Sequence, residues 1–297
     1  MHWITFELKG YPNSKGFTNT SPTLFDHELS VVLASNRKIK WVKTENWNKD
    51  QITKRGVLRK EITDSKILLV GCGALGSLLA DQIVRLSCKQ LKLVDGEKLH
   101  VGNLSRHSLL FTDVENFKAE ALCKKLNTIL PFVKVTFDHD TIEEIRRKNP
   151  NYVDDFNIII EATGSDSVLE LISEEAATFP NKIFISVSTG FKADRFFILV
   201  YKSGANDKSL AESFRENFKK WHYKELQASQ NAEELVDGIG CWNPLFPARI
   251  DDLQMHIGAS IKLIEKAVEP DAASISFHVI EKQYNSEGVF SGLVVKS

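Results

Sequence analysis

The sequence predicts an α/β fold with a doubly wound, mostly parallel β-sheet. Short apolar runs at 67–70, 91–94 and 156–160 alternate with segments of helical apolar periodicity. Strands that are buried on both faces give such continuous runs, whereas half-buried strands alternate. A glycine turn directly follows the first run, and the C-terminal tail alternates as two antiparallel strands would. These three observations together favour a parallel sheet that ends in antiparallel strands.

Residues 1–60 do not follow this pattern, and we expect them to form a small N-terminal extension to an α/β domain over 61–297. Two short strands are predicted in the extension, at 30–34 and 39–42, around a polar turn. The extension shows no catalytic constellation. A docking or dimer-contact element is therefore expected here in preference to an independent domain.

The composition argues against several classes of protein. Lys and Arg number 38 against 39 Asp and Glu, so no broad field favours nucleic acid or an anionic membrane. No apolar run approaches the ~20 residues of a membrane span, and the N-terminus lacks a signal-peptide pattern. The four cysteines are scattered without a Cys-x-x-Cys pair. That usage indicates a reducing cytoplasm and argues against a paired-cysteine zinc site.

The glycine turn is the centre of the predicted site. Gly71, Gly73 and Gly76 follow the first strand, a helix is expected to begin at Ala74, and Asp95 ends the next strand. This order of strand, glycine turn, helix, strand and acid is that of a nucleotide-binding βαβ unit. Glycines let the backbone approach a phosphate, and the helix start directs N–H groups at the anion. The strand, helix and acid favour phosphate binding over an accidental glycine turn.

The residues after Asp95 indicate which nucleotide is bound. An ordinary dehydrogenase needs only the acid, for a ribose hydroxyl, but Asn103, Arg106 and Lys118 add an amide and two cations. Arginine and lysine can neutralise a triphosphate and a developing pyrophosphate. For Arg106 alone, a salt-bridged residue in a solvated loop is the better explanation. An NAD-dependent oxidoreductase stays open as an alternative, although the two cations argue against it.

In combination, these motifs resemble the ubiquitin-activating enzyme and ThiF/MoeB/HesA adenylyltransferase family. The matching elements are the glycine turn, Asp95 with Glu97, the run Asn103-Leu104-Ser105-Arg106, and Lys118. They cover residues 66–118, and a looser resemblance in fold extends to about 268. His107 stands where glutamine is commoner, which looks most like bacterial members from ubiquitin-like conjugation and antiphage operons. The resemblance implies a Rossmann-like activating-enzyme fold.

The resemblance also implies an activity and its partners. The substrates would be ATP with Mg²⁺ and a small ubiquitin-like protein, and a homodimer and a conjugating-enzyme partner are expected. An arginine upstream of the first strand would reach the nucleotide, often in the neighbouring subunit; Arg55 is the first candidate and Arg59 the second, while solvated linker residues are the alternative. The nucleotide-binding residues implied are Gly71, Gly73, Ala74, Gly76, Asp95, Glu97, Asn103, Arg106 and Lys118.

The next strand end departs from the family pattern. The family usually has Asp-x-Thr-Asp there, with the final aspartate helping to hold magnesium, whereas this chain reads Glu161-Ala162-Thr163-Gly164. Asp166 would either supply the missing carboxylate or cap a helix expected over 168–177. Because of Gly164, a non-catalytic half of a paired activating enzyme stays open as an alternative.

An insertion over 203–240 carries an apolar stripe at helical spacing, formed by Leu210, Phe214, Phe218 and Trp221. The stripe predicts a helix that packs on the body or belongs to the loop that crosses over the adenylate in the family. Cys241 follows the insertion between glycines and a proline. We expect it to capture the acyl group as a thioester. A small buried residue, with adenylation that needs no thioester, is the alternative.

The remaining elements complete the alternation of helix and strand. Helices are expected at 121–129, 142–148 and 251–268, and strands at 133–137, 182–187, 195–201, 274–279 and 288–295. Cys72, Cys88 and Cys123 fall within the glycine turn or the helices of this pattern, and we expect them to be structural.

Overall fold

The computed structural model describes residues 6–7, 26, 40–41, 45–204, 208–230 and 248–297. The chain divides into two compact units, Met1–Arg55 and Gly56–Ser297. In the first unit, β1 (Phe6–Glu7) pairs antiparallel with β2 (Lys40–Trp41), and α2 spans Lys49–Ile52. The strand predicted at 39–42 is therefore present as β2, with β1 as its partner. The strand predicted at 30–34 lies outside the described residues.

The second unit is built on an eight-stranded sheet in the order β10-β9-β8-β7-β6-β3-β4-β5. The five strands from β3 to β7 pair in parallel, and β8, β9 and β10 pair antiparallel. The predicted fold class is confirmed. The strands are β3 (Lys66–Val70), β4 (Gln90–Val94), β5 (Lys134–Asp138), β6 (Ile158–Glu161), β7 (Ile183–Thr189), β8 (Arg195–Lys202), β9 (Ile275–Tyr284) and β10 (Phe290–Lys296).

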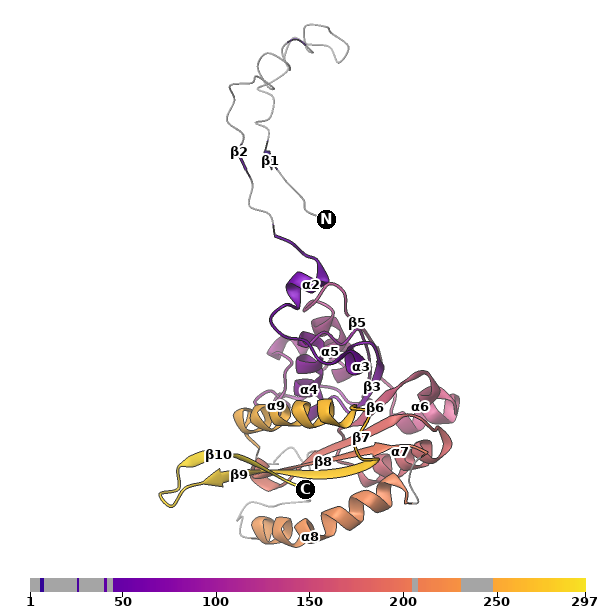
Figure 1. Cartoon of the computed structure of the whole chain (residues 1–297), viewed down its shortest axis with the longest axis vertical. Helices are drawn as coiled ribbons and strands as arrows, with labels where there is room; N and C mark the ends of the chain where they lie inside the picture. The colour runs from indigo at the N-terminus through magenta and orange to yellow at the C-terminus, as the bar shows by residue number, and fades with distance from the viewer. Residues whose placement is uncertain (1–5, 8–25, 27–39, 42–44, 205–207, 231–247) are drawn as a thin grey trace. The chain divides into compact units, whose positions relative to one another are not determined.

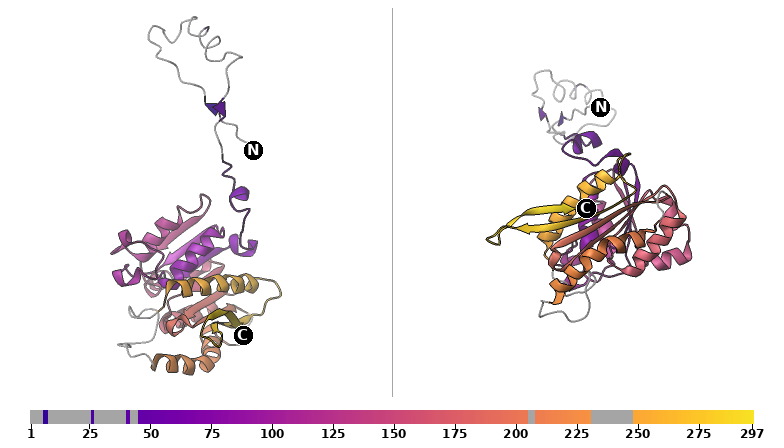
Figure 2. Two further views of the ribbon diagram at one scale, coloured as in Figure 1. Left: turned by 90° about the vertical axis from the view of Figure 1, so that its left-hand side faces the viewer. Right: turned by 60° about the horizontal axis from the view of Figure 1, so that its bottom comes forward.

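Helices cover both faces of this sheet (Figures 1 and 2). Ile67 and Leu69 of β3 belong to a core with α4, α5 and α9, whereas Leu68 and Val70 belong to a second core with α6, α7 and α8. Because successive strand residues point to opposite faces, both must be apolar, which explains the continuous run. The helices are α3 (Lys60–Thr63), α4 (Ala74–Arg85), α5 (Lys118–Leu126), α6 (Ile142–Lys148), α7 (Asp166–Thr178), α8 (Leu210–Gln230) and α9 (Ile250–Ala267), with 3₁₀ turns η2 (Val101–Asn103), η3 (Phe111–Asp113), η4 (Tyr152–Asp155) and η5 (Phe191–Ala193).

The winding of the sheet reverses between β3 and β6. From β3 the chain adds β4 and β5 on one side and then returns to place β6 and β7 on the other. Open α/β sheets bind ligands beyond the carboxyl ends of their strands at such a switch point. The strand order alone therefore locates the candidate site.

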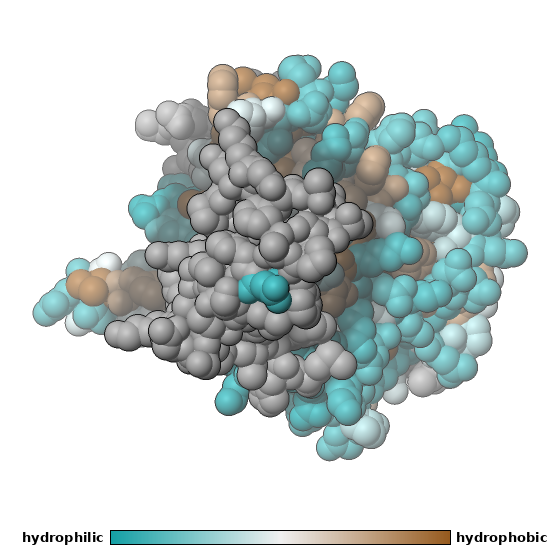
Figure 3. Space-filling view, turned by 90° about the horizontal axis from the view of Figure 1, so that it is seen from above, coloured by the Kyte–Doolittle hydropathy of each residue, from teal (hydrophilic) through white to brown (hydrophobic). Residues whose placement is uncertain are grey.

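The antiparallel end of the sheet is more exposed than its centre. On the β9–β10 hairpin, large hydrophobic side chains reach solvent at Tyr284, Val289, Phe290, Val294 and Val295. Figure 3 shows hydrophobic colour on this hairpin, which projects at the left of the view. Among the helices that the structure describes, none combines the length and apolar composition needed to cross a membrane.

Candidate functional site

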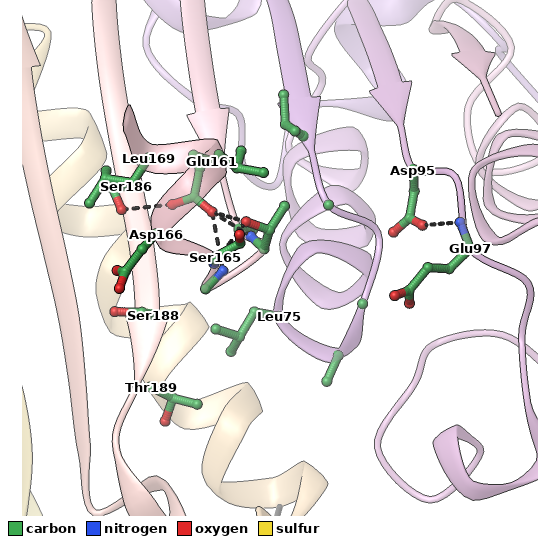
Figure 4. Close-up of a pocket in the computed structure, with 18 of the residues that line it drawn as sticks. Leu75, Asp95, Glu97, Glu161, Ser165, Asp166, Leu169, Ser186, Ser188 and Thr189 are labelled. Atoms are coloured by element: carbon green, nitrogen blue, oxygen red, sulfur yellow. Dashed lines mark hydrogen bonds between the residues drawn. The ribbon is translucent and has the colours of Figure 1, made fainter. Parts of the chain in front are cut away.

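A cavity of about 1390 Å³ lies beyond the carboxyl ends of β3, β4, β6 and β7. Figure 4 shows Asp95 and Glu97 on one side of it, Glu161, Ser165 and Asp166 on the other, and Leu75 between them. The cavity therefore occupies the switch point of the sheet. Its wall includes two main regions: the glycine-turn half, formed by the glycine turn and residues 95–118, and the α8 half, formed by β7, β8 and α8. Residues within 141–143 and 161–169 also line the cavity.

The three glycines of the turn serve two different purposes. Gly71 has φ +91°, and a Cβ there would lie 2.9 Å from the Ala162 carbonyl carbon. A Cβ on Gly76 would lie 1.9 Å from the Gly71 oxygen. These two positions need glycine for backbone packing. Gly73, the N-cap of α4, has no atom within 4 Å of an added Cβ. It leaves open space in front of the helix start, where unpaired N–H groups favour an anion.

Asp95 ties the end of β4 to this turn. One carboxylate oxygen accepts the Cys72 N–H at 2.6 Å and the other accepts the Glu97 N–H at 2.8 Å. Burial raises the pKa of Asp95, although the Lys118 ammonium and both N–H donors act in the opposite direction. The predicted ribose-binding acid thus lines the cavity and also holds the glycine turn in place.

The two predicted cations are both buried in the cavity wall. The exposed fraction is 7% for Arg106 and 5% for Lys118. Lys118 forms an ion pair with Glu97, whose side chain is exposed. Asn103 also lines the cavity, and its side-chain oxygen accepts the His100 N–H at 3.0 Å. Both cations line the same cavity as the start of α4. Positive charge and helix N–H groups therefore border one space, which suits a polyphosphate.

Of the two acids at the opposite strand end, Glu161 has its carboxylate fully engaged. It is 2% exposed and accepts hydrogen bonds from the Thr163 N–H and hydroxyl, both at 2.6 Å, and from the Ser186 hydroxyl at 2.8 Å. Burial raises its pKa. Asp166 is exposed, lines the cavity and opens α7, while Ser165 is the N-cap.

The glycine that departs from the family pattern lies in a turn with left-handed backbone. Gly164 has φ +69°, the left-handed region that side chains other than Asn and Asp rarely adopt. Its N–H donates to Glu161 at 3.1 Å. Glu161 thus accepts hydrogen bonds from within the turn that joins β6 to α7. Asp166, two residues after Gly164, lines the cavity.

The α8 half of the cavity includes residues that the sequence did not single out as site residues. The predicted stripe on α8 is divided: Leu210 and Trp221 are buried, whereas Phe214 and Phe218 are half-buried and line the cavity. The Phe218 ring packs edge-on against Phe197 at 4.9 Å. Polar residues at the end of β7, Ser186, Ser188 and Thr189, complete this half. The sequence feature that could have identified these three residues is their position at the end of a predicted strand.

An ion pair between the half-buried Arg195 and the buried Glu225 holds α8 against the sheet. The Glu225 carboxylate accepts one hydrogen bond from the Arg195 guanidinium at 2.8 Å and another from the Phe191 N–H at 2.8 Å. Arg195 also donates to Glu281 of β9 at 2.7 Å. Glu225, which interrupts the apolar stripe in the sequence, therefore fixes the helix that forms one wall of the cavity.

The other predicted residues are not brought to this site by the described part of the chain. Cys241 lies outside the described residues. Arg55 belongs to the first compact unit, so its role stays a prediction, and Arg59 donates to Glu269 at 2.7 Å and does not line the cavity. Within the described ranges, no three His, Cys, Asp or Glu side chains are grouped to hold a metal ion.

The three described cysteines are buried. Burial raises the pKa of each thiol, that of Cys88 to about 12. A raised pKa disfavours the thiolate, which is the nucleophilic form. The microenvironments of Cys72, Cys88 and Cys123 therefore suit structural residues.

Comparisons with known proteins find relatives over most of this chain. The model of the ThiF family matches residues 44–243. The ATP-dependent ubiquitin transferase-like protein Cap2 of Enterobacter hormaechei is 32% identical over 277 residues, which cover 90% of this chain and 44% of that protein. Cap2 of Pseudomonas aeruginosa is 31% identical over 37% of this chain and 20% of its own length. The chain thus spans less than half the length of these curated relatives.

A solved structure supports the fold. The crystal structure of E. coli MccB with AMPCPP and MccA superposes with a TM-score of 0.56 at 16% identity, covering 86% of this chain and 73% of that one.

Proposed function

The chain belongs to the ThiF family, and from that premise we propose that it is an adenylyltransferase that uses ATP to activate the C-terminal carboxylate of a small ubiquitin-like protein. One observation carries the proposal: the glycine turn and two buried cations, Arg106 and Lys118, line the same cavity. The name of the Enterobacter relative, an ATP-dependent ubiquitin transferase-like protein, supports the choice of nucleotide and of acyl donor.

The proposed reaction must overcome the repulsion between a carboxylate and a polyanion. The glycine turn binds the phosphates, and Asp95 accepts a hydrogen bond from the ribose. An oxygen of the carboxylate attacks the α-phosphorus, the bond to the bridging oxygen breaks, and pyrophosphate leaves. Arg106, Lys118 and the Asn103 amide take up the charge of the phosphates and the leaving group. The product is an acyl-adenylate.

Magnesium fits this site through Asp166. Mg²⁺ is usually held by one or two carboxylates together with the substrate phosphates, so the exposed Asp166 carboxylate on the cavity wall is sufficient as the protein ligand. When bound, the ion neutralises phosphate charge. We expect Asp166→Ala to abolish carboxylate-dependent ATP–pyrophosphate exchange and to leave the melting temperature nearly unchanged. If Asp166→Ala exchanged pyrophosphate at the wild-type rate, Asp166 would serve only the first turn of α7 and not the metal ion.

We assign the α8 half of the cavity to the end of the acyl donor. The cavity of about 1390 Å³ is larger than the ~300–1,000 Å³ of pockets for drug-sized ligands. The part of the cavity that the nucleotide would not fill adjoins Phe214, Phe218 and the polar end of β7. If the C-terminal segment of the acyl donor lay extended in the α8 half, its carboxylate would reach the nucleotide in the glycine-turn half.

We further propose that Cys241 accepts the acyl group. Its thiolate would attack the acyl carbon, AMP would leave, and the resulting thioester would pass to a conjugating enzyme. The acyl donor should then form a thiol-sensitive adduct on non-reducing gels. Cys241→Ala should lose the adduct and keep pyrophosphate exchange. An adduct that survives the change moves the nucleophile elsewhere, and exchange without any adduct indicates a thioester-free adenylyltransferase.

We also propose a homodimer in the cytoplasm in which Arg55 reaches the partner's nucleotide. A mixture of Arg55→Ala and Lys118→Ala chains should regain part of the exchange that each lacks alone. If each variant stays inactive in the mixture, Arg55 acts within its own chain or not at all.

The central test is a titration with ATP and with NAD, followed by exchange in the presence of ubiquitin-like proteins. ATP binding with magnesium and substrate-dependent exchange are expected. Tight NAD binding without any response to ATP would overturn the assignment. ATP binding without exchange, with the proper substrate present, would favour a non-catalytic half of a paired enzyme.

A further inference from the structure

His107 is a buried residue of the cavity wall that the proposed chemistry does not use. It is 4% exposed, and it stands one residue after Arg106. Its Nε2 lies 2.6 Å from the carbonyl oxygen of Cys72 in the glycine turn. Its Nδ1 lies 3.0 Å from the backbone nitrogen of Leu109. Both ring nitrogens are therefore in contact with the backbone.

These two contacts determine the protonation state of the ring. A backbone N–H can only donate, so Nδ1 must carry the lone pair that accepts from Leu109. The proton is then on Nε2, which donates to the Cys72 carbonyl. Burial lowers the pKa of His107 to about 4, and nearby Lys118 and Lys125 act in the same direction. The neutral ring is the form that makes both hydrogen bonds.

The Cys72 carbonyl belongs to the peptide that also carries the Gly73 N–H. A trans peptide is planar, so its C=O and N–H point in opposite directions. The preceding peptide is held separately, because its N–H donates to Asp95 at 2.6 Å. Holding the Cys72 carbonyl therefore fixes the direction of the Gly73 N–H, beside the open space at the start of α4.

We propose that His107 is a positioning residue for ATP: by holding the Cys72 carbonyl it sets the Gly73 N–H to donate to a phosphate oxygen. This inference rests on the proposed function, since it requires a phosphate at the glycine turn. It adds to that function a residue that touches neither substrate. The group that it acts through is the peptide between Cys72 and Gly73.

The chain contains a matched control. His256 of α9 is also buried, at 0% exposed, and its Nε2 lies 2.8 Å from the carbonyl oxygen of Ala193. Burial lowers its pKa as well. It does not line the cavity. A purely structural role for a buried histidine should give the same phenotype at both positions.

The experiment compares His107→Leu, His107→Gln and His256→Leu by calorimetric titration with ATP and by competition with adenosine, which has no phosphate. His107→Leu should weaken ATP binding about tenfold, the size expected for loss of one hydrogen bond, and leave adenosine binding unchanged. His107→Gln keeps an N–H donor and should restore ATP affinity to within about twofold. His256→Leu should lower the melting temperature and leave the affinity of the folded protein for ATP unchanged.

Three results would overturn the inference: wild-type ATP affinity in His107→Leu, equal losses for ATP and adenosine, or the same loss in His256→Leu. Failure of His107→Gln to restore affinity also counts against it. If the leucine variant does not fold, His107→Asn takes its place, because its shorter amide cannot reach as far. A wild-type chain that binds no ATP overturns the proposed function itself, whereas wild-type binding with an unaffected leucine variant overturns this inference alone.

Discussion

The two halves of the cavity are built in different ways. The glycine-turn half comes from one segment, residues 66–118, and depends on backbone geometry and on the charges of Arg106 and Lys118. The α8 half is assembled from β7, β8 and a helix of the insertion, and side chains such as Phe214 and Phe218 form its surface. A site formed by the backbone of one segment restricts which residues can occupy that segment. A site made of side chains from distant elements leaves few constraints that a sequence reveals.

The sharpest test of the backbone-built half is a pair of glycine substitutions. In Gly76→Ala the new Cβ would meet the Gly71 oxygen at 1.9 Å, a backbone atom that cannot move aside. We expect a loss of more than about 4 kcal/mol in the free energy of unfolding. In Gly73→Ala the new Cβ meets no atom within 4 Å. That variant should keep its stability and lose ATP affinity.

Urea unfolding and ATP titration measure both quantities for the pair. A Gly76→Ala protein as stable as the wild type would mean that the turn is not packed as described. The comparison between the halves would then lose its basis.

Acid should destabilise the glycine-turn half through His107. Its pKa falls from the ordinary 6.5 to about 4 in the folded chain, so between these values the unfolded chain binds more protons. The neutral His107 ring therefore leaves the free energy of unfolding undiminished at pH 7. As the pH falls from 6.5 toward 4, this free energy decreases by up to about 3 kcal/mol. Burial is the main cause of this lowered pKa, and Lys118 and Lys125 add to it. The hydrogen bond to the Cys72 carbonyl and the charge of Asp113 oppose it.

Urea unfolding at several pH values checks this expectation. His107→Gln should flatten the decline over that range. An unchanged decline in the variant would assign the acid sensitivity to other groups.

Arg106→Ala tests charge in the same half. The substitution should cost about 1.5–3 kcal/mol in ATP binding, the range for a hydrogen bond to a charged group. Arg85→Ala is the control, because Arg85 is an exposed arginine of α4 that pairs with Asp81 away from the cavity. Equal effects of the two substitutions on ATP affinity would mean that Arg106 acts only through the overall charge of the protein and not through a direct contact with phosphate.

Glu225→Gln tests the α8 half and should have the smallest effect. It removes the charge paired with Arg195, which keeps Glu281 as a second partner. We expect a loss of about 1–2 kcal/mol in stability with unchanged ATP affinity. Glu216→Gln, at an exposed ion pair of the same helix, should change stability by less than about 1 kcal/mol. A loss of ATP affinity in Glu225→Gln would show that the halves are coupled.

The same difference explains what the sequence could predict. The continuous run in β3 predicted a strand buried on both faces, and both cores confirm it. The glycine spacing predicted the start of α4 at Ala74, which is where the helix begins. Both predictions depend on local geometry, which residues next to one another determine.

Predictions that depend on long-range contacts were incomplete. The stripe on α8 could not be divided into buried and cavity-lining residues without the position of Phe197 on β8. The burial of Glu161 depends on the Ser186 hydroxyl of the neighbouring strand. The meaning of Gly164 depends on its φ of +69°. None of these quantities is encoded in the spacing of residues along one segment.

The strand order has a consequence for the route by which the chain folds. β7 and β8 form a hairpin that closes a short loop, whereas β3 must find β6, with Ile67 opposite Ile158. Closing a longer loop costs more entropy, and pairings between distant segments form slowly. The cavity lies at the β3–β6 seam, so it is completed only when this pairing has formed. Nucleotide can therefore bind only chains whose central pairing has formed, and it would trap them in the folded state.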